Sequence, residues 1–273
     1  MLARLSDSIL DGCQCDPAAP FAGDPARDFE LDKDESLSRF EALKHYLDEQ
    51  QQLLWANRRQ AVLLWLQGPD CSGKDGVIRH LFRGLNPQGV DVSNFQLPTQ
   101  EEREEDFLAR YRRRLPPPGS IGIFNRSPYE GVVGDLRDGF IQPAESQQRL
   151  QQIADFEDEL ARNEVYLLKV YLQISPEEQL KRLRKRILTP HKHWKLSSAD
   201  LYAHRQFAQL QTEWASALSA SQRAAAPWYV LPSDHKWLRD LLLASLLARQ
   251  LAALNLQWPT PPLPFGLEAL EHG

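Results

Sequence analysis

The chain has 273 residues, of which 42% are hydrophobic and 25% are charged, and its net charge is −5 at pH 7. This length fits one large domain or two small ones, and the composition is that of a globular protein, which excludes collagen-like, disordered and coiled-coil classes. The negative balance also excludes a protein that binds nucleic acid over much of its surface. A polyanionic ligand would therefore have to meet a local basic patch.

The three cysteines do not form a disulfide framework. Cys13 and Cys15 are separated by one residue and Cys71 stands alone, with no second Cys or His pair at the spacing of a zinc site. The N-terminus lacks the apolar run of about 7–15 residues that a signal peptide needs. The best membrane candidate, Trp237–Leu256, is interrupted by Arg239, Asp240, Arg249 and Gln250. We expect a cytoplasmic protein with free thiols that binds neither membrane nor nucleic acid.

The first elements in chain order surround a glycine-containing loop. Residues 1–35 show no hydrophobic period and are predicted to form an N-terminal arm, whereas 36–57 have a helical spacing with Ser36 as the cap. Residues 61–67 form a continuous apolar run, which predicts a strand buried on both faces of a parallel sheet. The loop 68–76 and a helix over 77–85 follow.

Four more strands alternate with helices along the rest of the chain. We predict strands at 90–97, 120–125, 165–174 and 228–231, and helices at 100–115, at 143–163, from 175, at 198–220 and after a cap at Ser233. A loop is expected between the third strand and the helix at 143. This alternation predicts one α/β domain, 36–256, with a five-stranded parallel sheet flanked by helices. The Pro-rich residues 257–273 are predicted to form a tail.

The loop between the first strand and its helix reads GPDCSGKD and fits the pattern G-x-x-x-x-G-K in the context that a phosphate-binding loop requires. Its N–H groups and the helix N-terminus would bind an anion, and Lys74 would reach the outer phosphates. Asp75 replaces the Ser or Thr that binds Mg²⁺ in ordinary P-loop NTPases, and Asp70 lies inside the loop. Two acids in a phosphate site predict a catalytic loop with a cation. The alternative is a tight strand–helix turn.

Asn125 and Arg126 follow the third predicted strand, at the sheet edge where α/β proteins bind ligands. Arg126 could bind a phosphate through two N–H groups, or could merely form a surface ion pair.

A basic segment, residues 179–195, contains seven cations and no acid, whereas the rest of the chain has 25 basic and 37 acidic residues. Such a run is often only a solvated helix face. In a P-loop protein it also fits a mobile lid that supplies arginines to the transferring phosphoryl group, and we favour the lid.

Four spaced motifs together resemble the polyphosphate kinase 2 family. They are the loop 68–76 with its unusual Asp70 and its Lys-Asp-Gly ending, the stretch Ile123–Glu130, the lid stretch Arg186–Ser197 and the stretch Ala226–Trp237. The resemblance runs from about residue 30 to 250. One departure is Gly131–Asp135, which stands where we expect an apolar run with an Arg; the nearest basic residue is Arg137.

The resemblance implies a thymidylate-kinase-like P-loop kinase fold with a helical lid at about 182–200. It implies Mg²⁺-dependent phosphoryl transfer, with Mn²⁺ as a substitute, between inorganic polyphosphate and AMP, ADP, GMP or GDP. The implied catalytic residues are Asp70, Lys74, Arg126, Arg182 and Arg186, with Asp70 as the metal ligand and Asn125 beside it. The implied phosphate-binding residues are Gly68, Ser72, Gly73, Lys74, Asp75, Gly76, Lys192 and Lys195. The implied nucleotide-binding residues are Asn125, Arg126, Tyr129 and Glu130.

Two other functions stay open on the sequence. An ATP-dependent nucleoside monophosphate kinase would need no polyphosphate, and the missing Ser or Thr after Lys74 argues against it. A P-loop protein that senses nucleotide or RNA without chemistry is supported only by the altered stretch after Glu130. We also expect a homodimer or homotetramer.

Overall fold

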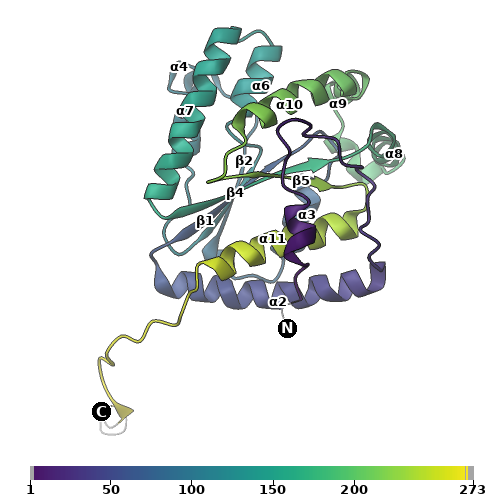
Figure 1. Cartoon of the computed structure of the whole chain (residues 1–273). Coiled ribbons are helices and arrows are strands. Elements are labelled where there is room, and N and C mark those ends of the chain that lie inside the picture. Colours follow the sequence, from purple (N-terminus) through teal and green to yellow (C-terminus); the bar gives the residue numbers. More distant parts are fainter. Residues whose placement is uncertain (1–2, 268, 270–273) are drawn as a thin grey trace.

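The computed structural model describes residues 3–267 and residue 269. Its five strands form one parallel sheet in the order β2-β3-β1-β4-β5 (Figure 1). This confirms the predicted α/β class and the five-stranded parallel sheet. The strands are β1 (Ala61–Gln67), β2 (Val90–Asn94), β3 (Ile121–Asn125), β4 (Val165–Gln173) and β5 (Trp228–Pro232).

The helices cover both faces of the sheet, with α2, α3 and α11 on one face and α6, α7 and α10 on the other (Figure 1). β1 lies in the centre because all its residues are buried, and its side chains alternate between the two cores. The apolar faces of α2 and α11 pack against each other in the same core, so packing within the domain explains why these two helix faces are apolar. The helices are α1 (Asp7–Asp11), α2 (Lys33–Asn57), α3 (Lys74–Leu81), α4 (Gln100–Glu104), α5 (Ala109–Arg112), α6 (Glu130–Arg137), α7 (Pro143–Arg162), α8 (Pro176–Ile187), α9 (Ser198–Arg205), α10 (Phe207–Ser221) and α11 (Lys236–Ala253), with short 3-10 helices η1 (Pro87–Gly89) and η2 (Pro190–Lys195).

The predicted N-terminal arm packs against the domain and includes the short helix α1, which the sequence did not reveal. Leu5 and Leu10 are buried in the core beside α2 and α11. Further along, Cys15 N donates to Trp228 O and Val230 N donates to Cys13 O, both at 2.8 Å, so the arm covers the outer edge of β5. Covering an edge strand removes a site of unwanted strand pairing.

Several predicted helix boundaries were wrong. The helix expected over 100–115 is two short helices, α4 and α5, and the one expected over 198–220 is divided at Gln206 into α9 and α10. The loop expected after β3 contains α6. Asp32, not Ser36, caps α2, because its side chain accepts a hydrogen bond from Glu35 N at 2.8 Å. Ser233 is no cap, because its hydroxyl donates to Leu231 O at 2.9 Å and α11 begins at Lys236.

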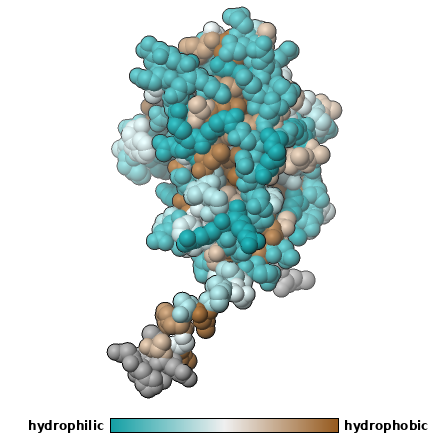
Figure 2. All heavy atoms as spheres, turned by 90° about the vertical axis from the view of Figure 1, so that its left-hand side faces the viewer, coloured by the Kyte–Doolittle hydropathy of each residue, from teal (hydrophilic) through white to brown (hydrophobic). Residues whose placement is uncertain are grey.

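The tail predicted at 257–273 has no helix or strand between 257 and 266, while 268 and 270–273, like residues 1–2 of the predicted arm, lie outside the described residues. Figure 2 shows the tail leaving the domain, whose visible face is mostly hydrophilic with a narrow band of apolar side chains. Within the described part of the chain, no helix has both the length and the apolar character that a membrane crossing needs.

Candidate active site

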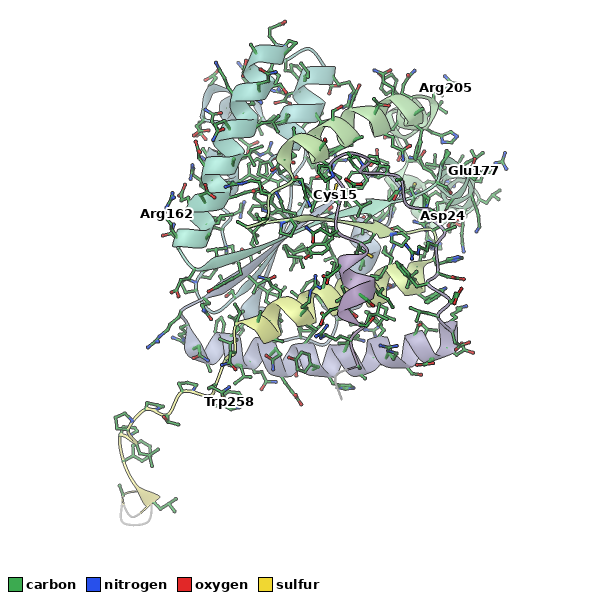
Figure 3. All side chains as sticks on the ribbon, in the orientation of Figure 1. Cys15, Asp24, Arg162, Glu177, Arg205 and Trp258 are labelled. Atoms are coloured by element: carbon green, nitrogen blue, oxygen red, sulfur yellow. The ribbon has the colours of Figure 1, made fainter. Side chains whose placement is uncertain are left out.

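The predicted site residues gather at the carboxyl ends of the parallel strands. Glu177 at the start of α8 and Arg205 at the end of α9 mark this side of the molecule, and Arg162, just before β4, marks the opposite side (Figure 3). β1 and β3 are neighbours, with Leu66 opposite Asn125, and Arg126 N donates to Leu66 O at 3.0 Å. The sheet therefore brings the phosphate loop and the Asn-Arg pair together, as strand order in α/β folds does for binding sites.

The phosphate loop has the backbone conformation that its glycines allow. Gly68 and Gly73 have φ values of +145° and +102°, which L side chains rarely adopt. A Cβ at Gly68 would lie 2.7 Å from Leu172 O, so only glycine fits. Gly73 is the N-cap of α3, and Lys74, Asp75 and Gly76 form its first turn. Ser72 is fully buried, and its hydroxyl has no hydrogen-bond partner.

The side chain of Lys74 folds back over the phosphate loop toward the first residues of the loop. Its Nζ donates to Gly68 O at 2.6 Å and to Pro69 O at 3.2 Å. Burial lowers the pKa of Lys74, and the nearby Asp70 carboxylate acts in the opposite direction. The ammonium is therefore held by backbone carbonyls inside the loop, from where a phosphate oxygen can take over its hydrogen bonds.

Asp70 and Arg126 face each other across the site. Their charged groups lie 3.6 Å apart, and both side chains are more than a third exposed. Arg126 also lies 4.0 Å from Glu130, and Gln67 Nε2 donates to the same Glu130 oxygen at 2.5 Å. Arg126 has a φ of +76°, a strained backbone for a non-glycine residue. The three charged groups form an open row, acid–base–acid, at the mouth of the loop.

Asp75 is the second acid of the phosphate loop and links three elements. Its Oδ1 accepts from Asn125 Nδ2 at 3.0 Å, and its Oδ2 accepts from Lys195 Nζ at 2.9 Å. Burial alone would raise the pKa of Asp75, but the hydrogen bonds and charge of Lys195, together with Asn125, lower it below its usual value. The resemblance implies that Asn125 sits beside Asp70; in the structure its amide donates to Asp75, the other acid of the loop.

The lid segment, about 182–200, consists of the second half of α8, the η2 turn and the start of α9. The structure places Arg182 behind the loop, where it donates to Cys71 O at 2.9 Å and Ser72 O at 3.0 Å. Arg186 Nη1 lies 3.3 Å from both Lys195 O and Asp200 Oδ1. Lys192 lies half-buried on η2. Of the predicted lid cations, Lys195 is the one that the structure brings into contact with the site acids.

Tyr129 does not belong to the site, and its predicted role in nucleotide binding is corrected. Its side chain is 1% exposed, and its hydroxyl donates to Glu157 Oε1 at 2.8 Å inside the core between the sheet and α7. Lys169 Nζ donates to the same carboxylate at 2.8 Å. Glu130, the next residue, faces the site.

The sequence reasoning missed three residues that hold the site together, Gln67 through the segment after β3 and Gln179 and Arg239 through the phosphate loop. Gln67 accepts from Ser127 N at 3.0 Å while it binds Glu130, Gln179 Nε2 donates to Asp70 O at 3.0 Å, and Arg239 Nη1 donates to Ser72 O at 3.3 Å. One signal was present: Gln67 is the only polar residue of the β1 run, and it lies at the end that meets the site.

Among residues 3–267 and 269 there is no group of three or more His, Cys, Asp or Glu side chains that could hold a metal alone. Mg²⁺ sites in phosphoryl transfer commonly use one or two carboxylates and complete the shell with water and phosphate oxygens. Asp70 fits such a site, because it is exposed beside the phosphate loop. The cluster can bind phosphates and neutralise their charge.

Comparison with known proteins gives consistent matches. Residues 30–258 match the family model described as polyphosphate kinase 2. The chain is 36% identical over 241 residues to the AMP/ADP-polyphosphate phosphotransferase of Meiothermus ruber, covering 88% of this chain and 90% of that protein. It is 36% identical over 242 residues to the ADP-polyphosphate phosphotransferase of Rhodopseudomonas palustris, covering 81% and 84%. The crystal structure of polyphosphate kinase 2 from Arthrobacter aurescens superposes with a TM-score of 0.90 at 32% identity, covering 96% of this chain and 94% of that one.

Proposed function

The chain belongs to the polyphosphate kinase 2 family, and on that premise we propose that it transfers a phosphoryl group between inorganic polyphosphate and a purine nucleotide. One observation carries the proposal: an acid within the phosphate loop, Asp70, lies 3.6 Å from Arg126 at the end of the neighbouring strand. A loop that only bound anions would gain nothing from a carboxylate at this place. An acid beside an arginine that can bind phosphate instead fits the binding of a metal ion and the orientation of an acceptor phosphate.

The reaction is an in-line displacement. A terminal phosphate oxygen of the nucleotide attacks the last phosphorus of polyphosphate, a new P–O bond forms, and the P–O bond to the rest of the polymer breaks. The polymer, shorter by one phosphate, leaves with the electron pair. Because the acceptor oxygen carries its own negative charge, the protein mainly has to position the two anions and neutralise their repulsion. We assign this role to Lys74 and Arg126, and to Lys195 from the lid, on the strength of their positions around the loop.

Phosphotransferases of this family generally work with a divalent metal ion. We propose Mg²⁺, with Mn²⁺ as a substitute, and Asp70 as the protein ligand. Bound there, the ion would supply charge neutralisation for the transferring phosphate. The donor set supports an oxygen-binding ion, because the exposed side chains around the loop that could act as ligands are carboxylates.

We propose that the acceptor nucleotide lies along Asn125, Arg126 and Glu130, with AMP and ADP as the first substrates to test and GMP and GDP beside them. The Meiothermus ruber relative, named for AMP and ADP, supports this choice. Tyr129 is left out because it is buried. The lid cations Arg186, Lys192 and Lys195 are proposed to bind polyphosphate when the lid is closed; Arg182 holds the loop backbone.

The deciding experiment offers the purified protein, Mg²⁺ and long-chain polyphosphate with AMP, ADP, GMP and GDP separately, and resolves the product nucleotides by chromatography. A reaction without polyphosphate but with ATP as donor tests the nucleoside monophosphate kinase. We expect phosphorylation only when polyphosphate is present. Binding of nucleotide with no product in any arm would support the non-enzymatic alternative and refute the proposal.

Asp70→Asn and Lys74→Ala test the assigned roles. We expect each to abolish ATP formation from ADP and polyphosphate while the variant stays folded, because the first removes the metal ligand and the second removes a phosphate contact. Arg223→Lys serves as the matched control, because Arg223 contacts Ala154 and Asp158 away from the loop. Near-normal turnover in folded Asp70→Asn would refute the role of Asp70.

The remaining proposals concern the whole molecule. We propose a single phosphotransferase domain over 36–256, a homodimer or homotetramer and a cytoplasmic location. Light scattering after size-exclusion chromatography measures the number of subunits. A molar mass equal to that of one chain would refute the proposed homo-oligomer.

A further inference from the structure

Arg239 is a buried arginine in the first turn of α11, and the proposed reaction does not use it. Its side chain is 1% exposed. A buried cation is tolerated only when it is paired and hydrogen-bonded. Asp240 provides the pairing, because its Oδ1 accepts from Arg239 Nε at 2.8 Å and from Nη2 at 2.5 Å. The other Asp240 oxygen lies 2.9 Å from His80 Nδ1 on α3.

The guanidinium nitrogen that Asp240 does not bind, Nη1, reaches the phosphate loop. Arg239 Nη1 donates to Ser72 O at 3.3 Å. The group lies directly against the backbone, since a Cβ at Gly73 would be 1.9 Å from the same Nη1. A Cβ at Gly76 would lie 3.8 Å from Nη2. The guanidinium therefore lies beneath the end of the loop and the first turn of α3, whose N–H groups would bind phosphate.

A second guanidinium converges on the same carbonyl. Arg182 Nη1 donates to Ser72 O at 3.0 Å and to Cys71 O at 2.9 Å, and its Nη2 donates to Ser233 O at 2.6 Å. Burial lowers the pKa of the neighbouring Lys236, and the positive charges of Arg182 and Arg239 lower it further. Two cations thus lie behind one backbone oxygen, although placing like charges together is unfavourable.

We propose that Arg239 is a positioning residue of the phosphate loop. By holding the Ser72 carbonyl on the inner side, it keeps the N–H groups of the loop turned toward the phosphate, and its fixed charge strengthens the positive potential there. Arg239 acts through the loop and does not touch the substrate. The inference rests on the proposed function for the identity of the anion, a polyphosphate.

The test separates anion binding from catalysis and from stability. Binding of inorganic tripolyphosphate to the full chain is measured by calorimetry without nucleotide, so that no turnover occurs, and unfolding is measured in urea. The variants are Arg239→Met, which removes charge and hydrogen bonds, and Arg239→Lys, which keeps the charge. Lys169→Met is the matched control, because Lys169 is an equally buried, paired cation that lies away from the loop.

We expect Arg239→Met to weaken tripolyphosphate binding about 10- to 100-fold, the equivalent of one charged hydrogen bond. Arg239→Lys should recover part of the loss, and the KM for polyphosphate should rise more than kcat falls. Lys169→Met should lose stability and keep its affinity. If Arg239→Met does not fold, Arg239→Lys provides the test, and it should bind tripolyphosphate more weakly than the wild type.

Wild-type affinity in a folded Arg239 variant, or an equal loss in Lys169→Met, would overturn the inference. So would a wild-type protein that binds no tripolyphosphate. A wild-type protein that binds tripolyphosphate and transfers no phosphate would refute the proposed function alone, and the Arg239 comparison would still stand.

Discussion

Replacing Gly73 with alanine should be among the most damaging single-methyl changes in this protein. Gly73 has a φ of +102°, and a Cβ there would lie 1.9 Å from Arg239 Nη1. The guanidinium cannot simply move aside, because Arg239 is 1% exposed and is held by Asp240. The added methyl group therefore meets both a strained backbone and an immobile neighbour.

The expected loss has two parts. A non-glycine residue in such a conformation costs about 1–3 kcal/mol. Displacing Arg239 from Ser72 O loses a hydrogen bond from a charged donor, which contributes about 1.5–3 kcal/mol. The free energy of unfolding of Gly73→Ala should therefore fall by about 2.5–6 kcal/mol, a large fraction of the stability of an ordinary domain.

A double-mutant cycle separates the two parts. Unfolding in urea is followed by fluorescence for Gly73→Ala, Arg239→Ala and the double variant, using the buried Trp65 and Trp228 as reporters. In the Arg239→Ala background only the backbone strain should remain, so the coupling between the two sites should be about 1.5–3 kcal/mol. Additive losses, with a coupling below about 0.5 kcal/mol, would refute the proposed steric conflict.

Three further predictions follow from burial and charge. Lys169→Met leaves Glu157 without the cation 2.8 Å away and should cost about 3–5 kcal/mol in urea unfolding at pH 7. Burial raises the pKa of Glu157, so in the folded variant this carboxyl favours its protonated form. The loss in free energy of unfolding should therefore shrink as the pH falls and grow as it rises, and a loss that stays constant from about pH 5 to pH 8 would contradict this. Burial raises the pKa of Cys13 to about 12, so its thiol should react with a disulfide reagent at pH 8 at least about tenfold more slowly in the folded protein than in urea, and equal rates would exclude the assigned burial. The lowered pKa of Asp75 means that its contact with Lys195 is present at neutral pH and is lost only as the pH falls below the usual value of 3.8. Lys195 Nζ lies 5.0 Å from the centre of the Trp194 ring, so the fluorescence of this tryptophan, taken as the difference between wild type and Trp194→Phe, should change when the contact is lost; a midpoint above pH 3.8 would contradict this.

The parts of the fold that sequence reasoning found are those in which one strong signal acts alone. β1 is a run of apolar residues that could only be buried on both faces, and the structure has the predicted bounds, Ala61–Gln67. α6 was missed because its eight residues include two glycines and its N-cap, Tyr129, makes no side-chain capping bond. The packing of α6 against α7 stabilises a helix that its own sequence does not favour.

The sequence predicted where the candidate site lies better than it predicted which side chains contact each other there. Strand order alone brings Asn125 and Arg126 to the phosphate loop, so their neighbourhood followed from the fold class. The direction of each side chain did not follow, because consecutive residues after a strand can face the core or the site. Tyr129 faces the core and Glu130 the site, and the Asn125 amide donates to Asp75.

The pairing of the N-terminal arm with β5 joins the two ends of the sequence and so affects the timing of folding. Leu5 N donates a hydrogen bond to Ser245 Oγ, 240 residues away in the sequence, at 3.0 Å. On the ribosome, the arm is made before its partners on β5 and α11. Contacts so distant in sequence slow folding, because a long loop must close before they form. During translation, Leu5 and Leu10 therefore lack their packing partners on α11, and the arm lacks its partner strand, until β5 and α11 have been made.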